Sequence, residues 1–205
     1  MFFRNILLII PLFYIIILVS CGLPAYSVAE APVRTSSDSD TVLVSFDAPV
    51  VDENIFGYEI YYKIYKFDSP DIAKDKEKFN SDSAAYEYES GSKKPVELKF
   101  NRLQYGEESN SIIPLISKDI LQSGQSVVIN FSENQILVNN VPIGAPKRII
   151  DQEEFTSDLI EGDSDSNGVV SGDVFKISFV AYSYVSAIIT THQSSIPVFL
   201  GTVER

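Results

Sequence analysis

Hydrophobic and polar residues alternate along several stretches of the chain, and this period of two predicts β-strands with two different faces. The clearest stretch, residues 57–67, carries Tyr58, Ile60, Tyr62 and Ile64 on one side. Strands are predicted over the ranges 41–46, 57–67, 95–104, 126–132, 135–143, 147–155, 174–186 and 196–203. The sequence therefore predicts an all-β chain built mainly from antiparallel strands.

Turn and cap residues add detail to this pattern. Glu133-Asn134 separates two alternating stretches and predicts a β-hairpin. Ser69-Pro70-Asp71 offers an N-cap, a proline at the first helical position and an acid in the first turn, so a short helix is expected to follow. No repeat of fixed period and no second linker is visible, which favours a single domain.

The beginning of the chain differs from the rest because it is continuously apolar. Residues 6–19 form an uncharged, largely aliphatic run of 14 residues, preceded by one positive charge at Arg4. A helix that spans a bilayer needs about 20 such residues, so the run fits the core of a cleaved signal peptide. Pro11 near its middle also favours a transient targeting segment over a permanent anchor.

A short motif, Leu18-Val19-Ser20-Cys21, ends this run. It resembles the lipobox of bacterial lipoproteins, which reads Leu, a small or aliphatic residue, a small residue and Cys. The resemblance implies cleavage before Cys21, a diacylglycerol on its sulfur and a fatty acyl chain on its new amino group. Acyl chains on Cys21 would then hold the protein on a membrane. Two alternatives stay open: an ordinary secretory signal with a chance cysteine, and a retained membrane anchor.

The residues after the cysteine bear on location and domain organisation. Gly22, rather than Asp, follows Cys21, which in well-studied diderm bacteria implies transport to the outer membrane. We expect a lipid-anchored protein of the cell envelope, on the periplasmic leaflet or the cell surface of the outer membrane rather than on the inner membrane. Residues 21–40 contain Pro, Ser and Asp without apolar periodicity and predict a flexible tether. The predicted division is a signal peptide at 1–20, the lipidated cysteine and tether at 21–40, and a β domain at 41–205.

Charge and composition exclude several classes of function. The chain has a formal net charge of −12, which argues against binding of nucleic acid or of anionic lipid headgroups. Cys21 and His192 are the only cysteine and the only histidine, so zinc fingers and disulfide frameworks are excluded. The exported domain must therefore be held together by packing.

Four of the predicted strands together resemble a fibronectin type III domain. Residues 44–49, VSFDAP, stand where that family's second strand reads apolar-x-Trp-x-x-Pro, and residues 57–62, GYEIYY, match the start of its third strand. Residues 169–181, VVSGDVFKISFVA, resemble the penultimate strand, and residues 194–202, SSIPVFLGT, the closing one. The resemblance implies a fibronectin type III or immunoglobulin-like antiparallel β-sandwich.

The chain departs from the family pattern at several positions. It contains no Trp, so Phe46 would fill the core position, and Phe175 replaces the corner Tyr and lacks its hydroxyl. Residues 41–205 exceed the family's usual domain length, which implies a large insertion over about 68–155 with a hairpin and short helices. The alternative is another antiparallel β domain that shares the same alternation.

Residues 163–173 resemble the first part of an EF-hand calcium loop. Asp163, Asp165 and Asn167 offer oxygen ligands at positions 1, 3 and 5, a glycine follows, and the carbonyl of Val169 stands at position 7. The acid of position 12 is missing, and the same composition is typical of a plain turn. Two interpretations stay open: a solvated turn, and a structural calcium site of weak affinity, roughly 10⁻⁴–10⁻³ M.

The sequence contains no clear set of residues that could form a catalytic site. His192 lies in a polar break between strands without a nucleophile motif nearby. Glu107-Glu108 and Glu153-Glu154 are adjacent pairs, and neighbours on a strand point to opposite faces, so neither pair forms a two-carboxylate site alone. No catalytic residue is predicted, and no cofactor apart from the structural calcium.

These observations predict a non-enzymatic, lipid-anchored envelope protein that presents loops and sheet edges to an unidentified protein or glycan partner. Tyr61 and Tyr65, on the polar side of residues 57–67, either pack in the ordinary way or form an adhesive patch. A periplasm-facing accessory subunit of an envelope assembly is the first alternative function. A hydrolase of glycans or peptidoglycan is the second.

Overall fold

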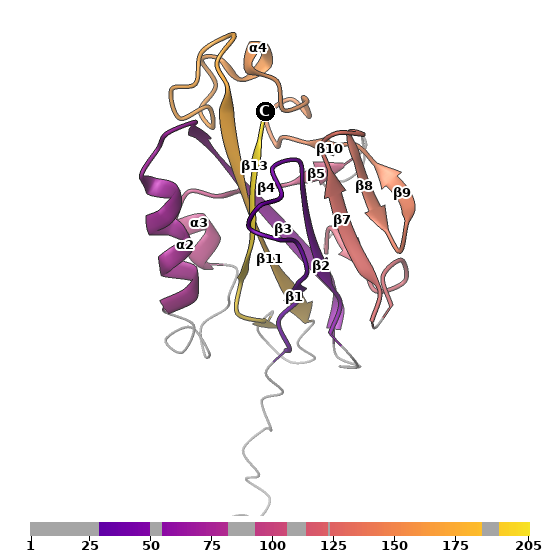
Figure 1. Cartoon of the computed structure of the whole chain (residues 1–205). Helices are drawn as coiled ribbons and strands as arrows, with labels where there is room; N and C mark the ends of the chain where they lie inside the picture. The colour runs from indigo at the N-terminus through magenta and orange to yellow at the C-terminus, as the bar shows by residue number, and fades with distance from the viewer. Residues whose placement is uncertain (1–28, 50–54, 82–92, 106–113, 123, 186–192) are drawn as a thin grey trace, which may run out of the picture.

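The computed structural model describes residues 29–49, 55–81, 93–105, 114–122, 124–185 and 193–205. Antiparallel β-sheets form most of this part of the chain, and short helices lie beside them (Figure 1). The strands predicted around 41–46, 57–67, 126–132, 174–186 and 196–203 are present. The prediction of an all-β, antiparallel chain is therefore confirmed.

The first sheet has the order β1-β2-β7-β8-β9, and each neighbouring pair is antiparallel. Alternate residues of its strands are buried, because one face of the sheet packs against the core. The strands are β1 Val33–Arg34, β2 Leu43–Asp47, β7 Ser126–Asn130, β8 Gln135–Val138 and β9 Val141–Gly144.

The second sheet is built around β3 and β11, which pair along almost their whole length. Its order is β12-β11-β3-β4, with β13 also on β11 and β6 also on β3. The strands are β3 Ile55–Lys66, β4 Asn101–Arg102, β6 Ile116–Ser117, β11 Phe175–Val185, β12 Gln193–Ser194 and β13 Val198–Glu204. The remaining elements are α2 Asp71–Ser81, α3 Lys93–Glu97, α4 Ser157–Ile160 and the pair β5 Gln104–Tyr105 and β10 Pro146–Lys147.

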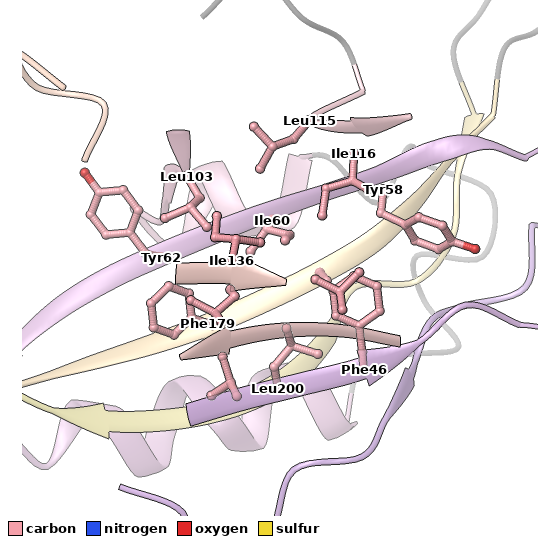
Figure 2. Packing of buried hydrophobic residues seen from close by; sticks show 14 of the residues in the cluster. Phe46, Tyr58, Ile60, Tyr62, Leu103, Leu115, Ile116, Ile136, Phe179 and Leu200 are labelled. Carbon is pink, nitrogen blue, oxygen red and sulfur yellow. The ribbon is translucent and has the colours of Figure 1, made fainter. Parts of the chain in front are cut away.

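The main core lies between the two sheets (Figure 2). Phe46 and Ile136 enter it from the first sheet, and Ile60, Tyr62 and Phe179 enter it from the second, each with none of its surface exposed. Burial of one such side chain stabilises the fold by about 1.5–3 kcal/mol. The alternation that predicted these strands is therefore the pattern of a face packed against another sheet.

A smaller hydrophobic cluster covers the other face of the second sheet. Phe79 of α2 and Phe100 meet edge to face at 5.3 Å, and both pack with Val180 and Phe199. The helices α2 and α3 lie on this side, away from the first sheet (Figure 1). Tyr65 is buried beneath them, so the alternative in which this face forms an open tyrosine patch is wrong at Tyr65.

The segment predicted as a tether is in part a component of the domain. Ala29 is buried in the main core, and the backbone oxygen of Glu30 accepts a hydrogen bond from Ser183 at 2.6 Å. β1 then pairs with β2, and Ser36 Oγ donates to the backbone oxygen of Leu200 at 2.7 Å. The prediction that the domain begins at residue 41 is therefore wrong, because residues 29–40 already form sheet and core contacts.

Three strand predictions also require correction. The stretch 135–143 divides into β8 and β9 at Asn139 and Asn140, whose φ angles of 49° and 65° allow a tight hairpin turn. The stretch 95–104 contains α3 and only two short strands, and 147–155 begins at the end of β10 and then leaves the sheet. Alternation alone did not reveal these breaks, since asparagine turns and a short helix can carry the same apolar spacing.

Candidate functional site

A buried arginine lies at the end of the molecule where residues 163–173 lead into β11. Arg148, directly after β10, has none of its surface exposed. Its Nη2 donates to Asp165 Oδ1 at 2.6 Å and its Nε donates to Asp165 Oδ2 at 3.2 Å. Nη2 also donates to Asp163, and Glu153 Oε2 lies 3.6 Å from Nη1. Three acidic side chains therefore surround one buried cation.

Tyr62 of β3 completes this group, and we call Tyr62, Arg148, Asp163 and Asp165 the inner cluster. The Tyr62 hydroxyl donates to Asp165 Oδ2 at 2.7 Å and accepts from the backbone nitrogen of Ile149 at 3.1 Å. Burial, and then the bond to Asp165, raise the pKa of Tyr62. Burial acts to lower the pKa of Arg148, but its bonds to Asp165 and Asp163 outweigh this and raise it. The arginine therefore stays charged and the tyrosine neutral.

The inner cluster contains two of the four residues that the sequence offered as calcium ligands. Asp163 and Asp165 bind the arginine, and Asn167 Nδ2 donates to the backbone oxygen of Ile64 at 2.6 Å. Val169 is packed in the core. Among the residues that the structure describes, no three His, Cys, Asp or Glu side chains are grouped to hold a metal. A guanidinium group holds the two carboxylates in this arrangement, and the calcium site stays a prediction.

A second group of similar composition lies on the opposite face of β3. Tyr65 donates to Asp75 Oδ2 of α2 at 2.8 Å, and Lys63 Nζ donates to the same oxygen at 2.7 Å. Lys63 also donates to the backbone oxygen of Leu98 at 2.9 Å. Burial, and then the bond to Asp75, raise the pKa of Tyr65. We call Tyr65, Lys63 and Asp75 the outer cluster.

The outer cluster opens into a cavity of about 500 Å³. Its walls come from the end of β3, the start of α2, the turn after α3 and the loop at residues 163–173. The charged and amide side chains of the lining are Lys63, Lys66, Lys99, Asp68, Asp71 and Asn167. The cavity therefore gathers three ammonium groups in a chain whose net charge is −12.

A further buried ion pair lies nearer the other end of β3. Arg102 Nε donates to Glu59 Oε2 at 2.6 Å, and Arg102 Nη2 donates to Glu59 Oε1 at 3.0 Å. Glu59 Oε1 also accepts from the backbone nitrogen of Leu115 at 3.1 Å. This two-pronged contact joins β3 to β4 and to the segment before β6, so the pair has a structural role.

Several sequence-predicted residues lie outside the described residues, namely Cys21, His192 and Glu107-Glu108. The lipidation site and the candidate base therefore stay predictions. In the part of the chain that the structure describes, no helix is both long and apolar enough to cross a membrane.

The other acidic pair, Glu153-Glu154, is described by the structure and serves local contacts. Glu153 faces Arg148, as given above, and Glu154 Oε1 accepts from Asn134 Nδ2 at 3.2 Å. The two side chains have different partners on different segments. The two carboxylates of this pair are therefore engaged separately, and the argument from strand geometry does not apply, because residues 153 and 154 lie outside the strands.

The basic residues of both clusters were missed by sequence reasoning. Arg148 stands directly before Ile149 and Ile150, and a single charge beside aliphatic residues is a weak signal of a buried ion pair. Lys63 falls on the polar side of an alternating strand, where a solvated side chain is the ordinary expectation. Its pairing with Asp75 depends on how α2 folds back over β3, which the local pattern does not encode.

Comparison with known proteins finds no family model that matches the chain, and no curated protein or solved structure that is significantly similar to it.

Proposed function

We propose that this chain is a lipid-anchored lipoprotein of the cell envelope, and that its β domain is a non-enzymatic binding module of the fibronectin type III or immunoglobulin-like class. The strand order supports the fold. In such sandwiches the second strand lies in one sheet, while the third, penultimate and last strands share the other. β2 lies in the first sheet, and β3, β11 and β13 lie together in the second. These four strands carry the sequence motifs that resemble the family.

The observation that carries the anchor proposal is the Leu18-Val19-Ser20-Cys21 motif at the end of a short apolar run. The position of Ala29 limits how far an anchored domain could lie from the membrane, because the described chain enters the core eight positions after Cys21. A fully extended chain of eight residues spans at most about 28 Å. Acyl chains on Cys21 would therefore hold the domain close to the bilayer surface.

The proposed anchor also favours one orientation of the domain relative to the membrane. Glu30 contacts Ser183 near the end of β11, whereas the loop at residues 163–173 lies at the start of that strand. The 11 residues of β11 span about 33 Å between the two ends. The end with the inner cluster and the cavity would then face away from the membrane, where a partner can reach it.

The proposed anchor is tested by Cys21→Ser in the full chain. We expect the variant to accumulate with its leader attached or to lose its acyl chains, and to leave the membrane fraction, since the sulfur that takes the lipid is absent. Mass spectrometry of the N-terminal peptide and fractionation of cells provide the measurement. Ser20→Ala, which keeps a small residue before the cysteine, is the matched control. A Cys21→Ser protein that is still acylated would overturn the proposal.

A binding role is favoured over hydrolysis by the partners of the acidic side chains. Asp163 and Asp165 bind Arg148, and Glu153 and Glu154 have separate partners. A separate experiment distinguishes a surface module from a periplasm-facing subunit. Cleavage of the protein by protease added to intact cells would indicate a surface module, and protection would indicate a periplasm-facing subunit.

A further inference from the structure

We propose that the cavity beside the outer cluster binds one oxyanion, the carboxylate or phosphate group of a small ligand. The inference deepens the proposed binding role and rests on it for its biological setting. Its chemistry depends only on residues that the structure describes. The cavity has a volume of about 500 Å³, within the range of roughly 300–1,000 Å³ that small-molecule sites occupy.

The lysines of the cavity have N–H donors that no described protein group uses. Among the described residues, Lys66 and Lys99 form no ion pair with a carboxylate. Lys63 has three N–H donors, and its contacts with Asp75 and Leu98 use two of them. Three lysines therefore line one cavity, and most of their N–H donors are not used by the described protein groups.

The three lysines differ in how firmly they are held, because Lys63 is largely buried whereas Lys66 and Lys99 are exposed at the opening of the cavity. Lys99 follows α3 with a φ of 62°, a left-handed conformation that glycine normally takes at a helix end. Lys66 runs beside Gly168, where a Cβ atom would lie 3.3 Å from Lys66 Cε. Lys63 is fixed beneath them, with its Nζ 5.2 Å from the centre of the Tyr65 ring. Lys63 is therefore preorganised for an anion, whereas Lys66 and Lys99 lose side-chain entropy when they bind it.

The acids of the lining limit the charge of the ligand. Asp71 is paired with Lys74 at 2.7 Å, and Asp68 stands at the same opening. Together with the acidic surface of the protein, these groups repel a polyanion such as nucleic acid. One carboxylate or phosphate fits the cavity, because it can accept from the lysines while the rest of the ligand points to solvent.

The proposal is tested by equilibrium dialysis of the full chain, purified in a neutral detergent, against inorganic phosphate and separately against acetate. We expect saturable binding of one anion per chain. Lys66→Gln should weaken it about tenfold, since a charged hydrogen bond is lost. Lys66 is exposed, so the variant is expected to fold. Lys118, directly after β6, lies beside the opposite end of β3, and Lys118→Gln removes the same charge there and should bind as the original chain does.

The two anions distinguish the source of the oxyanion. Tighter binding of phosphate supports a phosphate-bearing ligand, and tighter binding of acetate supports a carboxylate-bearing one. Binding of neither anion, or an equal loss in Lys66→Gln and Lys118→Gln, would overturn the proposal. The dialysis does not depend on acylation, so its failure is distinguishable from failure of the anchor, which the Cys21→Ser variant reports.

Discussion

The two faces of β3 carry two versions of one arrangement, and they differ in what lies beyond it. On each face a tyrosine donates to an aspartate that also binds a cation. Tyr62, Asp165 and Arg148 do so on the inner face, and Tyr65, Asp75 and Lys63 do so on the outer face. The inner cation meets further acids, whereas the outer cation meets a cavity.

This difference separates a structural ion cluster from a candidate ligand site. A buried charge is tolerated only when its partners satisfy it, and the inner cluster satisfies its arginine with protein groups alone. The outer cluster places a largely buried lysine beside the cavity, with one N–H donor left over. The loop at residues 163–173 serves both sides, since Asp165 belongs to the inner cluster and Asn167 lines the cavity.

The largest expected effect is that of Arg148→Met. The change leaves Asp163 and Asp165 without their cation, and Asp165 is only 4% exposed, so we expect a loss of about 3–5 kcal/mol in the free energy of unfolding. Lys63→Met should cost less, about 1.5–3 kcal/mol, since Asp75 keeps its bond to Tyr65. Urea unfolding followed by circular dichroism measures both. Equal losses in the free energy of unfolding would show that protein groups enclose the two cations to the same extent.

The next effect compares the two tyrosines. Tyr62→Phe removes a hydroxyl that donates to Asp165 and accepts from Ile149, and we expect it to cost about 2 kcal/mol. Tyr65→Phe should cost about 1 kcal/mol, because Lys63 still donates to Asp75. Phenylalanine keeps the ring contacts in both variants, so each serves as the control for the other. A larger loss in Tyr65→Phe would contradict the comparison.

The sequence predicted most of the strands because a two-sided packing pattern is local. Alternation gave β2, β3, β7 and β11 within a few residues of their observed bounds. The helix α2 was also predicted, since Ser69, Pro70 and Asp71 form its start. Alternation could not predict which faces of the strands are covered by other elements. The outer face of β3 looks polar in sequence, yet Glu59, Lys63 and Tyr65 are largely buried there by ion pairs and helices.

The candidate site was predicted only in part, because its residues come from distant segments. Asp163, Asp165 and Asn167 drew attention through their spacing, but their partners Arg148 and Ile64 belong to other elements. The lysines of the cavity come from β3 and from the turn after α3, and each is an ordinary surface residue in its local context. A binding site assembled by topology leaves no short motif.

The smallest expected effect concerns alkaline pH, where the two clusters should behave alike. Burial raises the pKa of both Tyr62 and Tyr65 above the unfolded value of about 10, so the folded state favours the neutral form. The stability that each neutral tyrosine contributes is complete below about pH 10 and is lost as the pH rises above it. At pH 10.5 the loss is about 0.8 kcal/mol for each residue.

Urea unfolding at pH 8 and pH 10.5 checks this prediction with the two phenylalanine variants. Each variant lacks one ionisable hydroxyl, so its alkaline loss should be about 0.8 kcal/mol smaller than that of the original chain. Tyr65 is buried beneath α2 even though it lines the cavity, and it should therefore match Tyr62. If Tyr65→Phe reduces the alkaline loss of stability clearly less than Tyr62→Phe does, water reaches the Tyr65 hydroxyl through the cavity. The outer cluster would then be open to solvent at its tyrosine as well as at its lysine.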